Sequence, residues 1–131
     1  MKEEINYANW LIIAKKAALK AGEQILKIYS KDFSVTYKAD KSPLTIADQQ
    51  ANEIIEGYLS KTNIPVLSEE GNITDFNLRK NWGLLWIVDP LDGTKEFIKK
   101  NGEFTVNIAL VKNGEPILGV IFVPVKGWLY Y

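Results

Sequence analysis

The sequence contains no cysteine and no histidine among its 131 residues. Disulfide bridges, thiol nucleophiles, zinc sites built from Cys and His, and Ser-His-Asp triads are therefore excluded for this chain. Any chemistry that the chain performs has to use carboxylates, hydroxyls, lysines, tyrosines or backbone groups.

An excess of charge of one sign is also missing, because 16 basic residues face 16 acidic ones and the net charge is zero. This balance argues against binding to nucleic acid polymers and against a polybasic membrane contact, although a single nucleotide remains a possible ligand. Lysines interrupt the apolar residues near the N-terminus, so neither a signal peptide nor an integral membrane segment is predicted. We expect a cytoplasmic location, with peripheral attachment at the inner membrane as the alternative.

The residues that are present are typical of a folded domain, with 47% hydrophobic and 24% charged residues. A chain of this length can bury a sizeable core without a disulfide or a metal. We therefore treat residues 1–131 as one α+β unit.

Two stretches have helical periodicity: apolar residues recur every three or four positions from Ile5 to Tyr29 and again from about Thr45 to Leu59. Between them, the alternation from Phe33 to Tyr37 predicts a strand, and Asp40 to Pro43 predicts a turn.

The rest of the chain is dominated by short apolar runs that predict strands. Two of them, Ile64 to Leu67 and Leu84 to Val88, end at acidic residues. Asn113-Gly114 predicts a hairpin between strands near 104–111 and 116–125, and 128–131 opens a further strand. The prediction is two helices on a mainly antiparallel sheet. Because the chain stops within a strand, we expect it to be the first part of a longer protein.

Acidic residues gather around the end of the second short run. Asp89 follows a buried strand, Pro90 is expected to fix a turn, and Asp92 lies three positions later. Gly93 and Thr94 then open a short helical turn whose free N–H groups suit a phosphate. Carboxylates beside such a turn favour Mg²⁺ bridging to phosphate oxygens, although turn formation alone also explains these residues.

Further acids follow or precede other predicted elements. Glu69 and Glu70 end the first short run, where two adjacent carboxylates repel each other unless solvated or neutralised by a cation. Asp48 lies in the first turn of the second helix, where it also stabilises the helix dipole. Each has an ordinary structural explanation alone, but together they offer oxygen ligands for more than one Mg²⁺.

Three stretches resemble the motifs of the inositol monophosphatase superfamily of Mg²⁺-dependent, lithium-sensitive phosphatases: 42–48 (SPLTIAD), 67–70 (LSEE) and 89–94 (DPLDGT). The following stretch, 95–110, is similar to the 3'(2'),5'-bisphosphate nucleotidase branch of that family. The resemblance implies the layered sugar-phosphatase fold, cut to its N-terminal lobe. It also implies conversion of 3'-phosphoadenosine 5'-phosphate, a small phosphorylated nucleotide, into AMP and phosphate.

The resemblance further implies a role for each site residue. Glu69, Asp89 and the backbone carbonyl of Leu91 would hold one Mg²⁺, and Asp89 and Asp92 another, in a site of two or three ions. Asp48, Glu70 and Thr94 would serve the attacking water as catalytic groups. Substrate-binding contacts would come from five residues around the phosphate: Glu69, Leu91, Asp92, Gly93 and Thr94.

Several alternatives stay open. The substrate could be an inositol phosphate or another small sugar phosphate. Members of the family are roughly twice as long as this chain, and a further metal-binding Asp in their C-terminal half is absent here, so a non-catalytic piece that binds metal or a partner is another alternative. A homodimer could supply the missing pocket wall. An aspartyl-phosphate phosphatase fits less well, because two residues instead of one separate Asp89 from Asp92.

Overall fold

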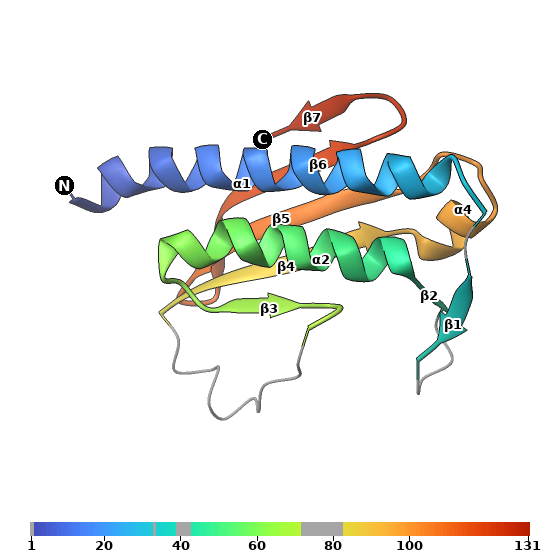
Figure 1. Ribbon diagram of the computed structural model, residues 1–131. Coiled ribbons are helices and arrows are strands. Elements are labelled where there is room, and N and C mark those ends of the chain that lie inside the picture. The colour runs from blue at the N-terminus through green and yellow to red at the C-terminus, as the bar shows by residue number, and fades with distance from the viewer. Residues whose placement is uncertain (1, 33, 39–42, 72–82) are drawn as a thin grey trace.

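The computed structural model describes residues 2–32, 34–38, 43–71 and 83–131 (Figure 1). Two long helices, α1 and α2, lie side by side on one face of a five-stranded sheet, and a separate two-stranded ribbon lies beside the short helix α4. The elements in chain order are α1 (Lys2–Tyr29), β1 (Val35–Tyr37), β2 (Pro43–Thr45), α2 (Ile46–Leu59), η1 (Ser60–Thr62), β3 (Val66–Ser68), β4 (Leu84–Asp92), α4 (Thr94–Ile98), β5 (Thr105–Lys112), β6 (Glu115–Val123) and β7 (Trp128–Tyr130).

The sheet has the strand order β3-β4-β5-β6-β7 and is mainly antiparallel, as the sequence predicts. Only β3 and β4 run parallel to each other, with Ser68 opposite Val88. Parallel neighbours end at the same edge of a sheet. The acidic residues that follow β3 and those at the end of β4 are thereby brought to one end of the molecule.

Small residues allow α1 to lie close to the sheet. Ala14, Ala17, Ala18 and Ala21 are fully buried, and a methyl group on Gly22 would lie 2.3 Å from the Phe122 ring of β6. Side chains of β4, β5 and β6 fill the space between the sheet and the helices, Trp86 among them. This apolar layer makes α1, α2 and the sheet one packed unit.

An aromatic cluster fixes α4 against the rest of the fold. Tyr29 at the end of α1 contacts Phe97 of α4 and Phe104, with ring centroids 5.3 and 5.0 Å apart. Phe97 and Phe104 meet edge to face at 5.2 Å, and both are buried. Because α4 begins at Thr94, this packing also places the 89–94 segment.

The hairpin and both long helices are confirmed, but the prediction for Pro90 is wrong. The strand does not stop at Asp89: β4 continues through a buried Pro90 to Asp92, with an irregularity in its pairing to β5 between Asp89 and Asp92. A bulge lets a strand accommodate a proline that has no N–H to donate. At the hairpin, Asn113 and Gly114 both have positive φ, of 51° and 85°, as a tight two-residue turn requires.

The sequence did not predict that Pro43–Thr45 would pair with β1 as a second strand. Phe33, most of the predicted 40–43 turn and the 72–82 stretch lie outside the described residues.

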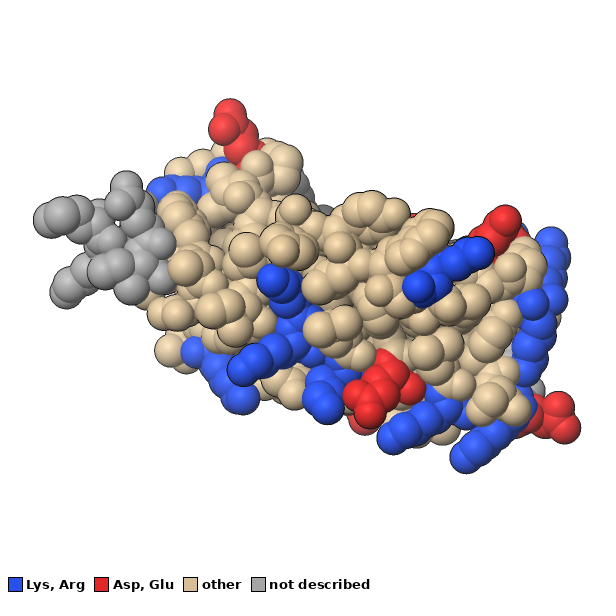
Figure 2. Space-filling view, turned by 90° about the horizontal axis from the view of Figure 1, so that it is seen from above, with Lys and Arg blue, Asp and Glu red and all other residues tan. Residues whose placement is uncertain are grey.

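The helices α1 and α2 cover one face of the five-stranded sheet and leave the other face open. The face opposite the helices carries exposed Ile87, Ile121, Trp128 and Tyr130. On the side of the molecule that carries α1, basic and acidic side chains are interspersed among other residues (Figure 2). No helix among the described residues has the length and hydropathy to cross a bilayer.

Candidate functional site

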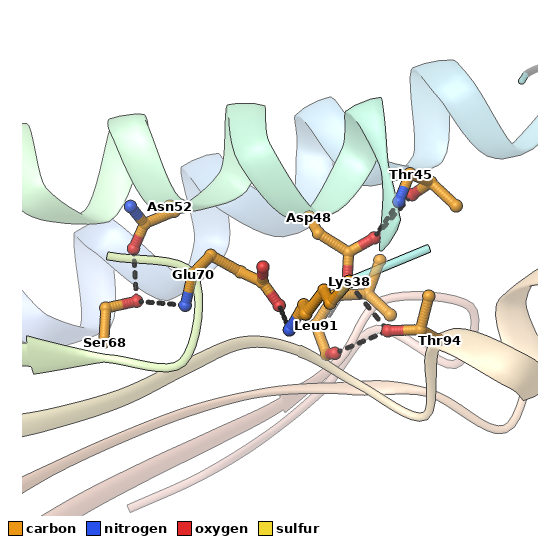
Figure 3. A network of polar contacts seen from close by, with 8 residues as sticks. All are labelled: Lys38, Thr45, Asp48, Asn52, Ser68, Glu70, Leu91 and Thr94. Atoms are coloured by element: carbon orange, nitrogen blue, oxygen red, sulfur yellow. Dashed lines mark hydrogen bonds and ion pairs between the residues drawn. The ribbon is translucent and has the colours of Figure 1, made fainter. Parts of the chain in front are cut away.

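The start of α2 is held by a carboxylate that also reaches α4. Asp48 is fully buried, and its Oδ2 accepts hydrogen bonds from the Thr45 backbone N–H at 2.8 Å and from the Thr45 hydroxyl at 2.6 Å. Its Oδ1 accepts a hydrogen bond from the Thr94 hydroxyl at 2.8 Å (Figure 3). Asp48 is therefore both a cap of its own helix and the link between α2 and the 89–94 segment.

A second link joins α2 to the turn after β3. The Ser68 hydroxyl donates a short hydrogen bond to Asn52 Oδ1 and accepts one from the Glu70 backbone N–H at 3.2 Å (Figure 3). Asn52 and Ser68 are both buried. The turn that carries the two adjacent glutamates is thus attached to the same helix as Asp48.

Glu70 is neutralised by a lysine from beyond β1. The Lys38 ammonium lies 2.7 Å from Glu70 Oε1, and the Glu70 side chain is nearly buried. Burial raises the pKa of Glu70, and the Lys38 ion pair offsets this only in part. For Lys38, burial alone lowers the pKa, but the hydrogen bond and charge of Glu70 outweigh it, so the pKa is raised.

The acids at the end of β4 lie in a different environment. The pKa of Asp89 is raised to about 7, first by burial and then by the nearby charges of Asp92 and Glu69 and a hydrogen bond to Asp92. Asp92 is exposed and accepts a hydrogen bond from Asn107 Nδ2 at 3.2 Å. In the parts of the chain that the structure describes, neither Asp89 nor Glu69 has a lysine or arginine partner.

These side chains surround one cleft of about 290 Å³. Of the residues predicted for the site, Glu69, Glu70, Asp89, Asp92, Gly93 and Thr94 line it. Asp48 lies behind Thr94, and the Leu91 carbonyl accepts from the Thr94 hydroxyl at 3.3 Å. The structure thus brings all the predicted residues to one end of the sheet. Lys38, Lys95 and Glu96 complete the lining.

The cleft suits a hard divalent cation by its chemistry. Its donors are carboxylates, a hydroxyl and a backbone carbonyl, which are oxygen ligands of the kind that Mg²⁺ prefers. Burial is the main cause of the raised pKa of Asp89, and the charges of Asp92 and Glu69 add to it; a bound cation would offset both effects. Within the described ranges, however, no three acidic side chains are already gathered closely enough to form a ready metal-binding group.

Sequence reasoning missed the buried pair Asn52 and Ser68. A helix position four residues after Asp48 was the available signal, since it lies on the same face. Two lysines, Lys38 and Lys95, reach the cleft. Lys100 instead donates to the Tyr29 and Lys31 carbonyls at the end of α1.

A sequence profile described as the Inositol monophosphatase family matches residues 6–131. Two relatives are named 3'(2'),5'-bisphosphate nucleotidase CysQ, one from Buchnera aphidicola subsp. Acyrthosiphon pisum, 51% identical over 117 residues, and one from Escherichia coli K12, 50% identical over 117 residues. Each alignment covers 86% of this chain but only 44% and 47% of the relatives. The chain spans about half the length of the curated relatives it matches.

Solved structures show the same relationship. The crystal structure of CysQ from Bacteroides thetaiotaomicron superimposes with a TM-score of 0.81 at 60% identity, covering 94% of this chain and 45% of that one. The extragenic suppressor protein suhB from Bartonella henselae superimposes with a TM-score of 0.80 at 32% identity, covering 92% of this chain and 46% of that one.

Proposed function

The chain belongs to the inositol monophosphatase family, and on that premise we propose that it is the N-terminal lobe of a Mg²⁺-dependent phosphomonoesterase that removes the 3'-phosphate of 3'-phosphoadenosine 5'-phosphate. The products would be AMP and phosphate. The observation that carries the proposal is the acidic cleft, in which crowded carboxylates adjoin Thr94 and its hydrogen-bond partner, the buried Asp48. The relatives named as bisphosphate nucleotidases support this substrate class.

The metal would be held by the acids of the cleft. Glu69, Asp89 and the Leu91 carbonyl would bind one ion, and Asp89 with Asp92 would bind another. Bound Mg²⁺ lowers the pKa of a coordinated water and neutralises charge on the phosphate. The raised pKa of Asp89 supports this assignment, because burial and the nearby charges of Asp92 and Glu69 both disfavour its ionised form when no cation is present.

Asp48 and Thr94 would receive a proton from the attacking water. The Thr94 hydroxyl donates its hydrogen to Asp48 or to the Leu91 carbonyl, so the lone pairs of Thr94 Oγ1 are free to accept a hydrogen bond from water. Asp48 is held by two hydrogen bonds from Thr45 and cannot swing away easily. A fixed acceptor of this kind orients the water for in-line attack.

The phosphate would be bound at the start of α4. Gly93 has φ of +93°, and a Cβ there would approach the Glu103 carbonyl to 2.9 Å, so glycine is required at this position. The N–H groups of Gly93 and Thr94 would donate to phosphate oxygens. Lys95, which lines the same cleft, adds a positive charge on the substrate side.

A second substrate class is supported by the structural neighbours. Inositol monophosphatase from Anabaena shares the fold, with a TM-score of 0.75 at 28% identity. An inositol or other small sugar phosphate is therefore the alternative, and a direct comparison of substrates decides between them.

The partner of the proposed lobe is a further question. The exposed apolar face with Ile87, Ile121 and Trp128 would be buried in a complete enzyme. A second copy of this chain, forming a homodimer, is the simplest partner that could bury it. We place the protein in the cytoplasm.

The test is phosphate release by this chain from 3'-phosphoadenosine 5'-phosphate and from inositol monophosphate, with Mg²⁺ and with or without Li⁺. We expect Li⁺-sensitive release from the nucleotide, lost by at least about 100-fold in Asp92→Asn. Asp32→Asn removes the same charge at an exposed position outside the cleft and should leave the rate unchanged. Faster release from inositol monophosphate would contradict the nucleotide assignment, and no release from either by a folded chain would support the non-catalytic alternative.

A further inference from the structure

One helix reaches both sides of the candidate site through two side chains one turn apart. Asp48 and Asn52 are four residues apart on α2, so they lie on the same face about 6 Å apart along its axis (Figure 3). Asp48 holds Thr94 at the start of α4, whereas Asn52 holds Ser68 at the end of β3. The distance between Thr94 and the Glu69–Glu70 turn therefore depends on this helix.

The Ser68 hydroxyl has a fixed direction because of its two contacts. It can accept the hydrogen bond from the Glu70 N–H only when its own proton points elsewhere, and that proton goes to Asn52 Oδ1. Ser68 and Asn52 are 8% and 6% exposed, so water does not readily replace either partner. Loss of the Asn52 acceptor would leave a buried hydroxyl unsatisfied and release its contact with Glu70.

The other contacts of the Glu69–Glu70 turn involve its backbone and the Glu70 carboxylate. The Glu69 N–H donates to the Val88 carbonyl at 3.0 Å, and the Gly71 N–H donates to the Ser68 carbonyl at 3.2 Å. The Glu70 carboxylate is paired with Lys38. Of these contacts, only the Ser68 hydroxyl connects the turn to α2.

We propose that Asn52 is a positioning residue that acts through Ser68 to fix the Glu69–Glu70 turn, and thereby sets the affinity of the cleft for divalent cations. This proposal rests on the proposed function. Asn52 does not line the cleft and would touch neither metal nor substrate. Groups that orient metal ligands typically change affinity 10- to 100-fold when they are removed.

The test compares Asn52→Leu, Ser68→Ala and their double variant with wild type. The matched control is Gln50→Leu, which makes the same kind of change, amide to leucine, on the same helix as Asn52. It removes the 2.6 Å hydrogen bond from Gln24 of α1 to Gln50 of α2. Circular dichroism first confirms that each variant is folded at the temperature used. The readouts are hydrogen exchange of the Glu70 amide without metal and Mg²⁺ affinity by calorimetry.

We expect faster exchange of the Glu70 amide and about 10-fold weaker Mg²⁺ binding in Asn52→Leu, with no change in Gln50→Leu. Because Asn52 acts through Ser68, the double variant should lose no more affinity than the stronger single variant. A purely structural contribution would instead give losses that multiply. Should Asn52→Leu fail to fold, Ser68→Ala removes less volume and tests the same link.

Unchanged Glu70 exchange and Mg²⁺ affinity in folded Asn52→Leu would overturn the proposal, as would multiplying losses in the double variant. A failure of the proposed function looks different. In that case the wild-type chain binds no Mg²⁺, while the Glu70 amide still exchanges faster in Asn52→Leu.

Discussion

The acids of the candidate site fall into two groups that differ in how fully the protein supplies them with partners. Asp48 and Glu70, which we call the paired acids, are held by protein donors: three hydrogen bonds for Asp48 and the Lys38 ammonium for Glu70. Asp89 and Asp92, which we call the crowded acids, lie beside each other, and burial and like charge raise the pKa of Asp89 to about 7. The fold thus satisfies one group itself and leaves excess negative charge on the other.

This difference indicates which acids stabilise the fold and which are available to bind a ligand. A carboxylate that accepts several protein hydrogen bonds contributes to stability, and its loss exposes unsatisfied donors. Carboxylates that repel one another cost stability, and they persist where a function uses them. Removing a paired acid should therefore weaken the fold, whereas removing a crowded acid should weaken cation binding without weakening the fold.

The largest expected effect is on the paired side. Asp48→Ala leaves the buried Thr45 N–H and hydroxyl without their acceptor, and it leaves the Thr94 hydroxyl with the Leu91 carbonyl alone. We expect the free energy of unfolding to fall by about 3 kcal/mol, measured by urea denaturation without metal. Asp48→Asn is the control, since it keeps the shape and part of the acceptor set and should lose less. A change below about 0.5 kcal/mol in Asp48→Ala would contradict the comparison.

The next effect is on the crowded side. Asp92→Asn should weaken Mg²⁺ binding about 100-fold because it removes a charged ligand, and Glu69→Ala should weaken it similarly. Neither variant should have a lower free energy of unfolding than wild type without metal. The measurement is Mg²⁺ titration by calorimetry together with urea denaturation. Unchanged affinity in both variants would show that neither Asp92 nor the neighbouring Glu69 holds the metal.

The pH dependence of stability without metal should also separate the groups. The pKa of Asp89 is about 7 in the folded chain and near 3.8 unfolded, so the folded state holds the proton more tightly. Its contribution is full below pH 3.8 and is lost as the pH rises through 7. Allowing for solvent screening, we expect a loss of about 1–2 kcal/mol from this group.

Asp89→Asn should flatten that part of the profile and make the metal-free chain more stable at pH 8. The measurement is the melting temperature from pH 4 to pH 8 with a chelator present, with Asp32→Asn as the control of equal charge. A wild-type profile that Asp89→Asn leaves unaltered would mean that the crowding costs nothing.

The smallest effect comes from converting a paired acid into a crowded one. Lys38→Met removes the partner of Glu70 and leaves a nearly buried carboxylate near Glu69 and Asp48. We expect the pKa of Glu70 to rise further and the free energy of unfolding at pH 7 to fall by about 1 kcal/mol. Lys20→Met breaks the exposed Lys20–Glu23 ion pair and should change stability less. Equal losses of unfolding free energy in Lys38→Met and Lys20→Met would show that the Lys38–Glu70 pair matters no more than an exposed ion pair.

Local chemistry made much of the fold predictable. The helical spacing in α1 and α2, the Asn113-Gly114 turn and the strand β5 each follow from short-range rules, and the structure has them where they were expected. Pro90 was misread because proline usually marks a turn. Its place in β4 depends on a bulge, and pairing with β5 determines whether a bulge forms.

The sequence by itself determined the kinds of group in the site: oxygen donors only, with acids at the ends of two short strands and at the start of a helix. It could not determine which acids are satisfied. The parallel pairing of β3 with β4 brings Glu69 toward Asp89, and the packing of α2 places Asp48 and Asn52 against α4 and β3. These contacts join residues far apart in the chain, so only the tertiary structure decided which carboxylates are paired and which are crowded.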